Sequence, residues 1–157
     1  MRTFLCSFEK FSLAIPINFV SSVMLMQGNQ NTAVEYDDRF RNTYISLPLL
    51  FNVSPEKTKH GIILKNDIND IDDEGVMEDR NILLINEIES ENEIPEDKIY
   101  SIPKILNVLQ FSSYVSGIIF SCTNILGNNK ANLSNKNIVF IINPEQLVKN
   151  INKELKI

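Results

Sequence analysis

The sequence contains no tryptophan, a single histidine (His60), two cysteines and no long apolar run among its 157 residues. A transmembrane helix needs about twenty consecutive apolar residues, and no stretch of this chain comes close to that length. Cys6 and Cys122 each lie in a strand-like run with no neighbouring cysteine, so we interpret both as reduced core thiols. Zinc, phosphate-loop, dinucleotide and nucleophile-elbow motifs are also missing, which predicts a protein that is not an enzyme and uses no cofactor.

The charge of the chain argues against nucleic-acid binding and export. Its formal net charge is −5, whereas a nucleic-acid binder needs a cluster of lysine and arginine to displace counterions from phosphates. Residues 1–6 superficially resemble an export signal, but Glu9 and Lys10 interrupt the apolar region well before the roughly 7–15 residues that such a signal needs. We therefore expect a cytoplasmic globular protein with no direct membrane insertion.

The chain does contain a series of short segments that are β-branched or alternate between apolar and polar residues. We predict strands at residues 3–8, 11–17, 20–26, 44–53, 59–65, 81–88, 99–102, 114–120 and 137–142. Pro16 is expected to stop its strand or place it at an edge, and Pro48 is expected at an edge or a bulge. Eight to ten short strands without alternating helices indicate a mainly β fold, either a barrel or a sandwich.

Polar segments separate these strands. Residues 27–43, 66–81 and 123–137 show little apolar periodicity and are expected to be loops. Residues 89–93 form a charged segment after a strand, and residues 105–109 have the spacing of a short helix or an apolar plug.

The C-terminal end has the clearest local signals. Residues 138–142 form a continuous β-branched and aromatic run, which predicts a strand buried on both faces. Asn143 can cap a helix, Pro144 suits its first position, and Gln146 lies three residues after the cap. Apolar residues then recur at helical spacing over residues 147–155, so we predict a helix that docks on the β core.

The acidic segment 66–81 suggests a calcium hypothesis, because clustered carboxylates hold hard cations. Four of its positions match the EF-hand spacing, and they are occupied by Asp70, Asp72, Glu74 and Gly75. The position of the bidentate glutamate is Asn81 instead, and no flanking helices are evident. We favour a solvated acidic loop and assign no metal site. We likewise interpret His60, which has no second ligand nearby, as an ordinary strand residue.

Several of these segments together resemble the CheW-like domain family. Residues 114–120 (aromatic-x-Ser-Gly-hydrophobic) and residues 138–147 (an apolar strand ending in Asn-x-Glu-x-Leu) resemble its C-terminal signature. Residues 45–50 resemble its Ile-x-Pro-x-x-Asp-Leu segment, and residues 82–99 resemble its Val-Asp-x-Val…Ile-Pro run. The opening segments at 4–17 and 20–23 resemble its first strands.

The resemblance implies a fold and a function. It implies that residues 1–157 form one CheW-like domain of two intertwined, five-stranded SH3-like β-barrel subdomains with a C-terminal helix. It also implies a non-catalytic adaptor, or scaffold, that couples chemoreceptor signalling domains to a CheA-type histidine kinase in chemotaxis signal transduction.

The same resemblance implies where partners bind. The family carries Asn-x-Arg-Gly before its proline segment, with the arginine in receptor contact; here residues 39–43 lack the glycine, and Arg39 or Arg41 could stand in. Ser22 aligns with a family glutamate, beside Val20 on the expected docking strand. Ser116 and Gly117 are either a partner contact or a place where Gly117 permits a bulge or close backbone approach, and we favour the second interpretation. The remaining candidate contacts are Val20, Ser22, Arg39 and Arg41.

Two alternatives stay open. The missing Arg-Gly motif and the long polar segments would also suit a divergent CheW-like scaffold in another signalling assembly, without the usual receptor contacts. The acidic segment would suit a regulator that responds to calcium or a small ligand.

Overall fold

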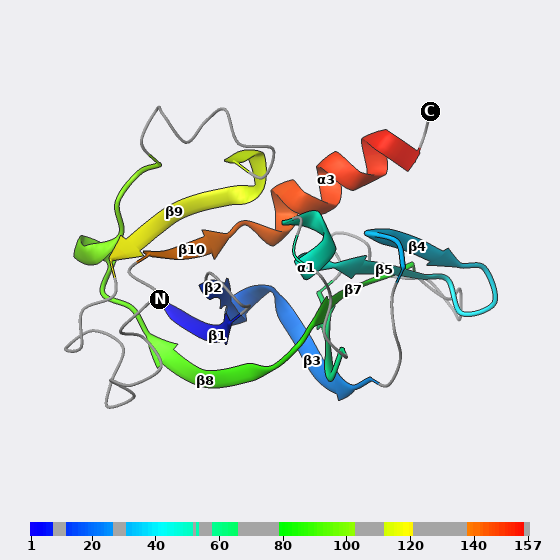
Figure 1. Cartoon of the computed structure of the whole chain (residues 1–157), viewed down its shortest axis with the longest axis horizontal. Helices are drawn as coiled ribbons and strands as arrows, with labels where there is room; N and C mark the ends of the chain where they lie inside the picture. Colours follow the sequence, from blue (N-terminus) through cyan, green and yellow to red (C-terminus); the bar gives the residue numbers. More distant parts are fainter. Residues whose placement is uncertain are drawn as a thin grey trace. The chain divides into compact units, whose positions relative to one another are not determined.

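The structure is a computed structural model that describes residues 1–7, 12–26, 31–51, 53, 58–65, 79–102, 112–120 and 138–155. The chain divides into two units (Figure 1). Unit 1 consists of Met1–Asn18 and Ile88–Ile157, and unit 2 consists of Phe19–Glu87. The two ends of the chain therefore build one unit, and the segment between them builds the other. None of the helices in the described ranges is long and apolar enough to cross a membrane.

Unit 1 contains a five-stranded sheet with the strand order β8-β1-β2-β10-β9. Its strands are β1 (Arg2–Ser7), β2 (Ser12–Pro16), β8 (Ile88–Glu93), β9 (Val115–Phe120) and β10 (Ile138–Ile142). β1 and β2 match the strands predicted at residues 3–8 and 11–17, and they pair antiparallel, with Phe4 opposite Ile15. β10 pairs antiparallel with β9 and parallel with β2, which places β2 at the centre of the sheet. All five residues of β2 are consequently buried.

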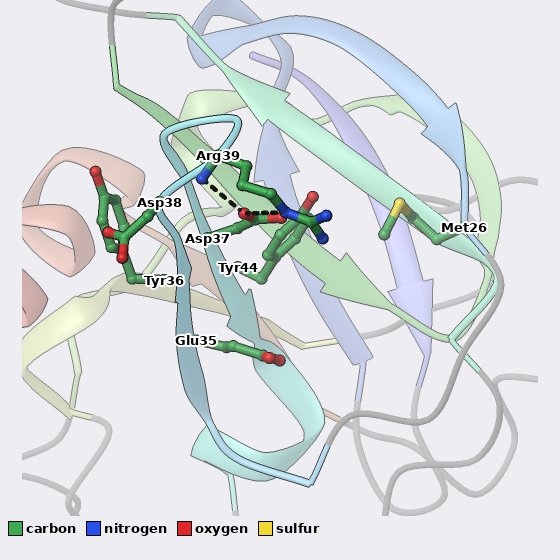
Figure 2. A pocket seen from close by; sticks show the side chains of 7 residues that line it. All are labelled: Met26, Glu35, Tyr36, Asp37, Asp38, Arg39 and Tyr44. Atoms are coloured by element: carbon green, nitrogen blue, oxygen red, sulfur yellow. Dashed lines mark hydrogen bonds and ion pairs between the residues drawn. The ribbon is translucent and has the colours of Figure 1, made fainter.

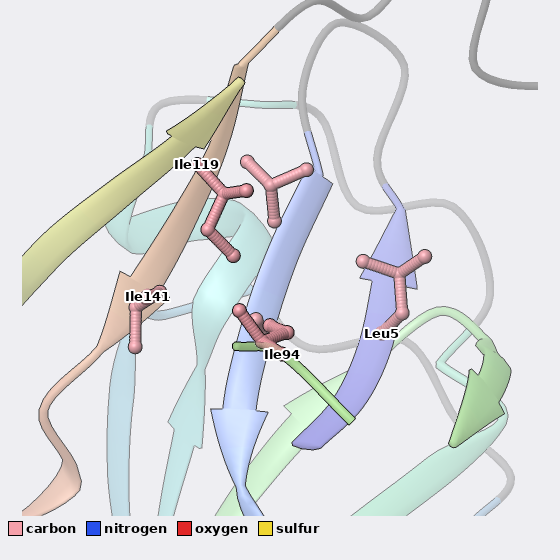
Figure 3. Close-up of a cluster of buried hydrophobic side chains, with 6 residues drawn as sticks. Leu5, Ile94, Ile119 and Ile141 are labelled. Carbon is pink, nitrogen blue, oxygen red and sulfur yellow. The ribbon is translucent and has the colours of Figure 1, made fainter. Parts of the chain in front are cut away.

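An apolar cluster fills the interior of unit 1 (Figure 3). Its members are Leu5, Ala14, Ile94, Ile119, Val139 and Ile141. They come from β1, β2, β9, β10 and the residue that follows β8, so every strand of the sheet borders the same core. Full burial of an aliphatic side chain of this size stabilises the folded state by about 1.5–3 kcal/mol. Ile94 also joins the chain start to the end of β8, because its N–H donates to the Met1 carbonyl at 2.7 Å.

The C-terminal helix follows the sequence signals that predict it. α3 (Pro144–Leu155) begins directly after β10, and the Asn143 Oδ1 accepts a hydrogen bond from the Gln146 N–H at 3.2 Å. Leu147 and Ile151, one turn apart, are buried. The predicted strand at 138–142 and the predicted helix are therefore both confirmed.

Unit 2 contains a second five-stranded sheet, with the order β3-β6-β7-β5-β4. Its strands are β3 (Val20–Leu25), β4 (Val34–Asp37), β5 (Asn42–Ser46), β6 (His60–Leu64) and β7 (Arg80–Ile85). β7 lies at the centre and pairs antiparallel with β6 and parallel with β5. Its last four residues have no exposed surface, as expected for a strand covered on both faces. The short 3₁₀ turn η1 (Ile17–Phe19) precedes β3.

Two predicted boundaries in unit 2 are wrong. Residues 27–43, expected to be a loop, contain β4 and the start of β5, which pair with Val34 opposite Ile45. The strand expected at 44–53 ends at Ser46, and the helical turn α1 (Leu47–Leu50) follows. The Ser46 hydroxyl caps this turn by accepting the Leu49 N–H at 3.4 Å. Pro48 therefore lies in the first turn of a helix, where its missing N–H removes no hydrogen bond, and not at a strand edge or bulge.

The charged segment 89–93 is also part of a strand. The strand expected at 81–88 ends at Ile85, and β8 begins at Ile88 and runs through the charged residues to Glu93. The glutamates of β8 are exposed and alternate with half-buried residues, which is the pattern of an antiparallel strand with one solvated face. Arg2 on β1 forms an ion pair with Glu91 on β8. Beyond β8, the turn η2 (Glu96–Lys98) leads to Tyr100, which bridges to Ile118 on β9.

Cys6 is a free, fully buried cysteine on β1, as predicted. Burial raises the pKa of its thiol strongly, and the nearby Glu89 carboxylate raises the pKa further. Cys122, the segment 105–109 and the loop expected at 123–137 lie outside the described residues. Within the described part, the chain is mainly β, with two five-stranded sheets and a C-terminal helix, as the predicted fold class requires.

Candidate protein-interaction site

The six predicted contact residues fall into two groups, one in each unit. Val20, Ser22, Arg39 and Arg41 belong to unit 2, and Ser116 and Gly117 belong to unit 1. Within unit 2, the first two lie on β3, a terminal strand, and the two arginines lie in the turn between β4 and β5. The structure supports a candidate surface on unit 2 and a different role for the pair in unit 1.

β3 is the most exposed strand among the described residues. Val20 is half-buried, Ser22 is exposed, and every residue from Ser21 to Leu25 is exposed. Three apolar side chains that the sequence analysis did not single out lie here: Val23, Met24 and Leu25, with 39%, 37% and 80% of their surface accessible. The available sequence signal for this exposure was the loose alternation of apolar and polar residues over 20–26, because a strand with one buried face alternates more strictly.

Arg39 is the freer of the two arginines. Its side chain is 85% exposed, and its guanidinium lies 5.8 Å from the centre of the exposed Phe40 ring. The Arg39 backbone N–H donates to Asp37 Oδ1 at 3.0 Å, which fixes the turn but leaves the guanidinium only at the outer limit of an ion pair, 4.0 Å from the same oxygen. Arginine and aromatic residues are both more frequent at protein interfaces than on the rest of the protein surface.

Arg41 is engaged within the chain. Its Nε donates to Asp79 Oδ1 at 2.9 Å, and its carbonyl accepts the Arg80 N–H at 2.9 Å. The hydrogen bond and charge of Asp79 raise the pKa of Arg41, and Tyr36 adds to the effect. Arg41 also has φ +53°, a left-handed conformation that favours glycine. These contacts tie the β4–β5 turn to the start of β7, so Arg41 is a structural residue of this turn.

A hollow of about 570 Å³ lies beside the β4–β5 hairpin. It is lined by Met26, Glu35, Tyr36, Asp37, Asp38, Arg39 and Tyr44. Figure 2 shows Glu35, Asp37, Arg39 and Tyr44 on the side of the hairpin toward Met26, and Tyr36 and Asp38 on the opposite side. The lining carries three carboxylates and one guanidinium, a net charge of −2, next to the end of the apolar strand β3.

Ser116 and Gly117 lie in β9, where a close approach explains the glycine. A Cβ on Gly117 would lie 2.8 Å from Ile99 Cγ2 and 3.1 Å from the Tyr100 carbonyl oxygen. The exposed Ser116 hydroxyl donates only a long hydrogen bond, 3.4 Å, to the Ile141 carbonyl. The geometry therefore supports the interpretation of Gly117 as a packing requirement.

The metal hypothesis falls mostly outside the described residues, because Asp70, Asp72, Glu74 and Gly75 are not among them; Asn81 lies in β7. Within the described ranges, no group of three or more histidine, cysteine, aspartate or glutamate residues could hold a metal ion. His60 begins β6, is half-buried, and has a buried Nδ1 without a hydrogen-bond partner.

Comparisons with known proteins define the fold class further. No protein-family model matches the chain, and no curated protein matches its sequence. Among solved structures, the chain resembles the crystal structure of the scaffolding protein TtCheW from Thermoanaerobacter tengcongensis. The two share 15% sequence identity with a TM-score of 0.54, and the match covers 90% of this chain and 82% of the other. The chain therefore has a CheW-like fold, as the sequence motifs predict.

Proposed function

We propose that this chain is a cytoplasmic, non-catalytic adaptor that couples chemoreceptor signalling domains to a CheA-type histidine kinase. The observation that carries the proposal is the likeness of fold to a scaffolding protein across 90% of the chain. A fold does not by itself define a function, so the proposal also depends on the residues at the surface of unit 2. We also propose that residues 1–157 form one domain of two intertwined subdomains, because unit 1 consists of both chain ends and unit 2 consists of the segment between them in the sequence.

The surface of unit 2 has the composition of an interface. The exposed apolar residues of β3 provide apolar surface that a partner would remove from water on binding. The exposed Arg39 and Phe40 provide a charged and aromatic rim. Arginine suits such a rim because its planar guanidinium can pair with a partner carboxylate through two hydrogen bonds. We assign the receptor-contact role to Arg39, since Arg41 already holds Asp79.

Co-sedimentation of the purified chain with receptor signalling domains and with a CheA-type kinase tests this proposal. Binding to both is the expected result, and binding to neither would remove the proposal. Arg39→Glu should weaken receptor binding about tenfold, equivalent to ~1.4 kcal/mol, without lowering the unfolding free energy. Lys98→Glu, an exposed lysine in unit 1, is the control and should bind normally.

Arg41→Glu separates the two arginines. It should lower the unfolding free energy, because it replaces an ion pair with two carboxylates facing each other at Asp79. If Arg41→Glu abolished receptor binding in a protein of unchanged stability, Arg41 and not Arg39 would be the contact residue.

A second candidate function is a scaffold in a different signalling assembly. The observation that favours it is the internal use of Arg41, together with the missing glycine of the Asn-x-Arg-Gly motif. Purification of the tagged chain from its native cell would distinguish the two functions. A stoichiometric partner other than a kinase or chemoreceptor would favour the second.

A further inference from the structure

The four terminal strands of the two sheets differ in how they are protected. β8 carries three exposed glutamates, and β4 carries Glu35 and Asp37. β9 has no charge, but Tyr100 bridges to it at Ile118 through two backbone hydrogen bonds of 2.9 Å. β3 has neither device: its sequence, VSSVML, contains no charged residue and no proline. Proteins usually protect a strand edge by such means against pairing with another chain.

The backbone of β3 offers hydrogen-bonding groups at its unpaired edge. Its antiparallel register with β6 continues through Met26, whose N–H donates to the Lys59 carbonyl at 2.9 Å. In antiparallel pairs, residues alternate between those that bond to the partner strand and those whose N–H and C=O point away from it. Met24 therefore bonds to β6 like Met26, and the N–H and C=O groups of Val23 and Leu25 point away from β6.

The side chains around this edge indicate what it would accept. Val23 and Leu25 are exposed and apolar, and the strand leads to Met26 at the acidic hollow. In that hollow, Arg39 already faces Asp37, so Glu35 is a carboxylate on the Met26 side that can receive a cation (Figure 2). A complementary ligand is thus apolar along β3 and basic next to Met26.

We propose that β3 is extended by a strand from a partner protein: a short, extended, apolar segment whose lysine or arginine enters the hollow beside Glu35. The inference rests on the proposed function, since it specifies how an adaptor of this kind takes hold of a partner. Added strands bind through their main chain, and side-chain pockets select the sequence. A second copy of this chain fits poorly as the occupant, because residues 20–26 contain no lysine or arginine to enter the hollow.

Proline at position 23 tests the backbone contact. Val23→Pro removes an N–H that points away from β6, so it should leave the β3–β6 pairing intact while preventing strand addition. The control Val23→Thr keeps the N–H and the β-branched shape. Val23→Pro should lose at least tenfold in affinity for the receptor signalling domain or CheA-type kinase that the wild-type protein binds, and Val23→Thr should lose no more than about twofold. Equal affinities for the two variants, with both folded by circular dichroism, would overturn the inference.

A synthetic peptide tests the same surface without any natural partner. The probe is acetyl-Thr-Val-Thr-Val-Thr-Lys-amide, titrated to millimolar concentration against the full chain labelled with ¹⁵N. The amide signals of Val23 and Leu25 should shift and gain protection from hydrogen exchange. Shifts confined to β8 or β9, or none at all, would overturn the inference.

Two variants test the basic residue of the ligand. Glu35→Gln should weaken peptide binding about threefold, and Glu96→Gln, an exposed glutamate in unit 1, should have no effect. Replacing the peptide lysine with norleucine should make Glu35→Gln and wild type bind alike. Unequal binding of the norleucine peptide would overturn the assignment of the hollow.

The outcomes also separate this inference from the proposed function. If the wild-type chain binds kinase or receptor and Val23→Pro binds equally well, only the strand addition is wrong. If the peptide adds to β3 but neither kinase nor receptor binds, the strand addition stands and the adaptor function falls. Concentration-dependent dimerisation that Val23→Pro abolishes would replace the partner protein with a second copy of the chain and overturn the inference.

Discussion

Replacing Gly117 with alanine adds a single methyl group at the point where β9 passes Ile99 and Tyr100. The new Cβ would lie 2.8 Å from Ile99 Cγ2 and 3.1 Å from the Tyr100 carbonyl oxygen, whereas carbon atoms pack comfortably at about 3.5–4.0 Å. Neither neighbour can easily retreat. Ile99 is β-branched and packs against the apolar cluster of unit 1, and the Tyr100 carbonyl accepts the Ile118 N–H at 2.9 Å.

The expected cost follows from this crowding. Forcing an extra methyl group into a well-packed site costs about 1–3 kcal/mol, because side chains leave their preferred rotamers or the backbone shifts. The higher intrinsic preference of alanine for a strand offsets about 0.5–1 kcal/mol of this. The two contributions together give a net cost of about 0–2.5 kcal/mol. Because both neighbours are held in place, we expect Gly117→Ala to lie in the upper part of this range and to lower the unfolding free energy by about 1–2 kcal/mol, which for a chain of this length lowers Tm by about 2–8 °C.

Two matched variants separate crowding from other effects of alanine. A Cβ on Gly61 would meet Ile82 Cγ2 and Met26 Cγ at 3.0 Å and Met24 Cγ at 3.2 Å, and the unbranched methionines can move aside. Gly61→Ala should therefore destabilise the protein less than Gly117→Ala. Ser116→Ala removes one long hydrogen bond from an exposed side chain and should change the unfolding free energy by less than about 0.5 kcal/mol.

Urea unfolding followed by circular dichroism measures all three variants against the wild type. The order of destabilisation should be Gly117→Ala, then Gly61→Ala, then Ser116→Ala, with similar m-values. If Gly117→Ala were as stable as wild type but failed to bind a partner, the glycine would be a contact residue and the close approach would not explain it.

Three further predictions concern single residues. Arg41→Gly should raise the unfolding free energy by up to about 1 kcal/mol, because a left-handed backbone conformation costs a residue with a side chain about 1–2 kcal/mol and the exposed ion pair with Asp79 contributes less than that. Arg41→Ala loses the ion pair and keeps the backbone strain, so it should lower the unfolding free energy. Asn143→Ala should lower it by about 1 kcal/mol in the same urea assay, by removing the cap of α3, whereas Asn143→Ser should restore most of the loss. Because the folded-state pKa of Cys6 is raised, the contribution of Cys6 to the unfolding free energy should be constant below pH ~8. It should fall above pH ~8.5, where only the unfolded chain loses the thiol proton, by up to ~1.4 kcal/mol per pH unit. Cys6→Ala should flatten this part of the curve, and an unchanged slope would show that other groups cause it.

Local signals were sufficient at the C-terminal end of the chain. The β-branched run of β10 and the cap at Asn143 predict a strand and a helix, and both occur where expected. Such elements can be predicted because the residues that cause them lie close together in the sequence: a side chain that caps the next helical turn, or a short run that is apolar on both faces of a strand. The buried Cys6 and the two strands β1 and β2 were predictable for the same reason.

Elements whose form depends on distant partners were not predictable. β4 and β8 are polar segments, and they become strands only because β5 and β1 lie beside them and supply the hydrogen bonds. The two parallel pairings, β10 with β2 and β5 with β7, join segments far apart in the chain, and no local pattern specifies them.

The candidate site shows the same division. The resemblance to the CheW-like family suggested contacts on β3 and in the turn with two arginines, whereas the exposed apolar residues of β3 became evident only in the structure. Only the tertiary structure separated Arg39 from Arg41, because that distinction depends on Asp79, which lies 38 positions away along the chain. It also decided that β3 is a bare sheet edge, since whether a strand is terminal depends on which other strands pair with it and not on its own residues.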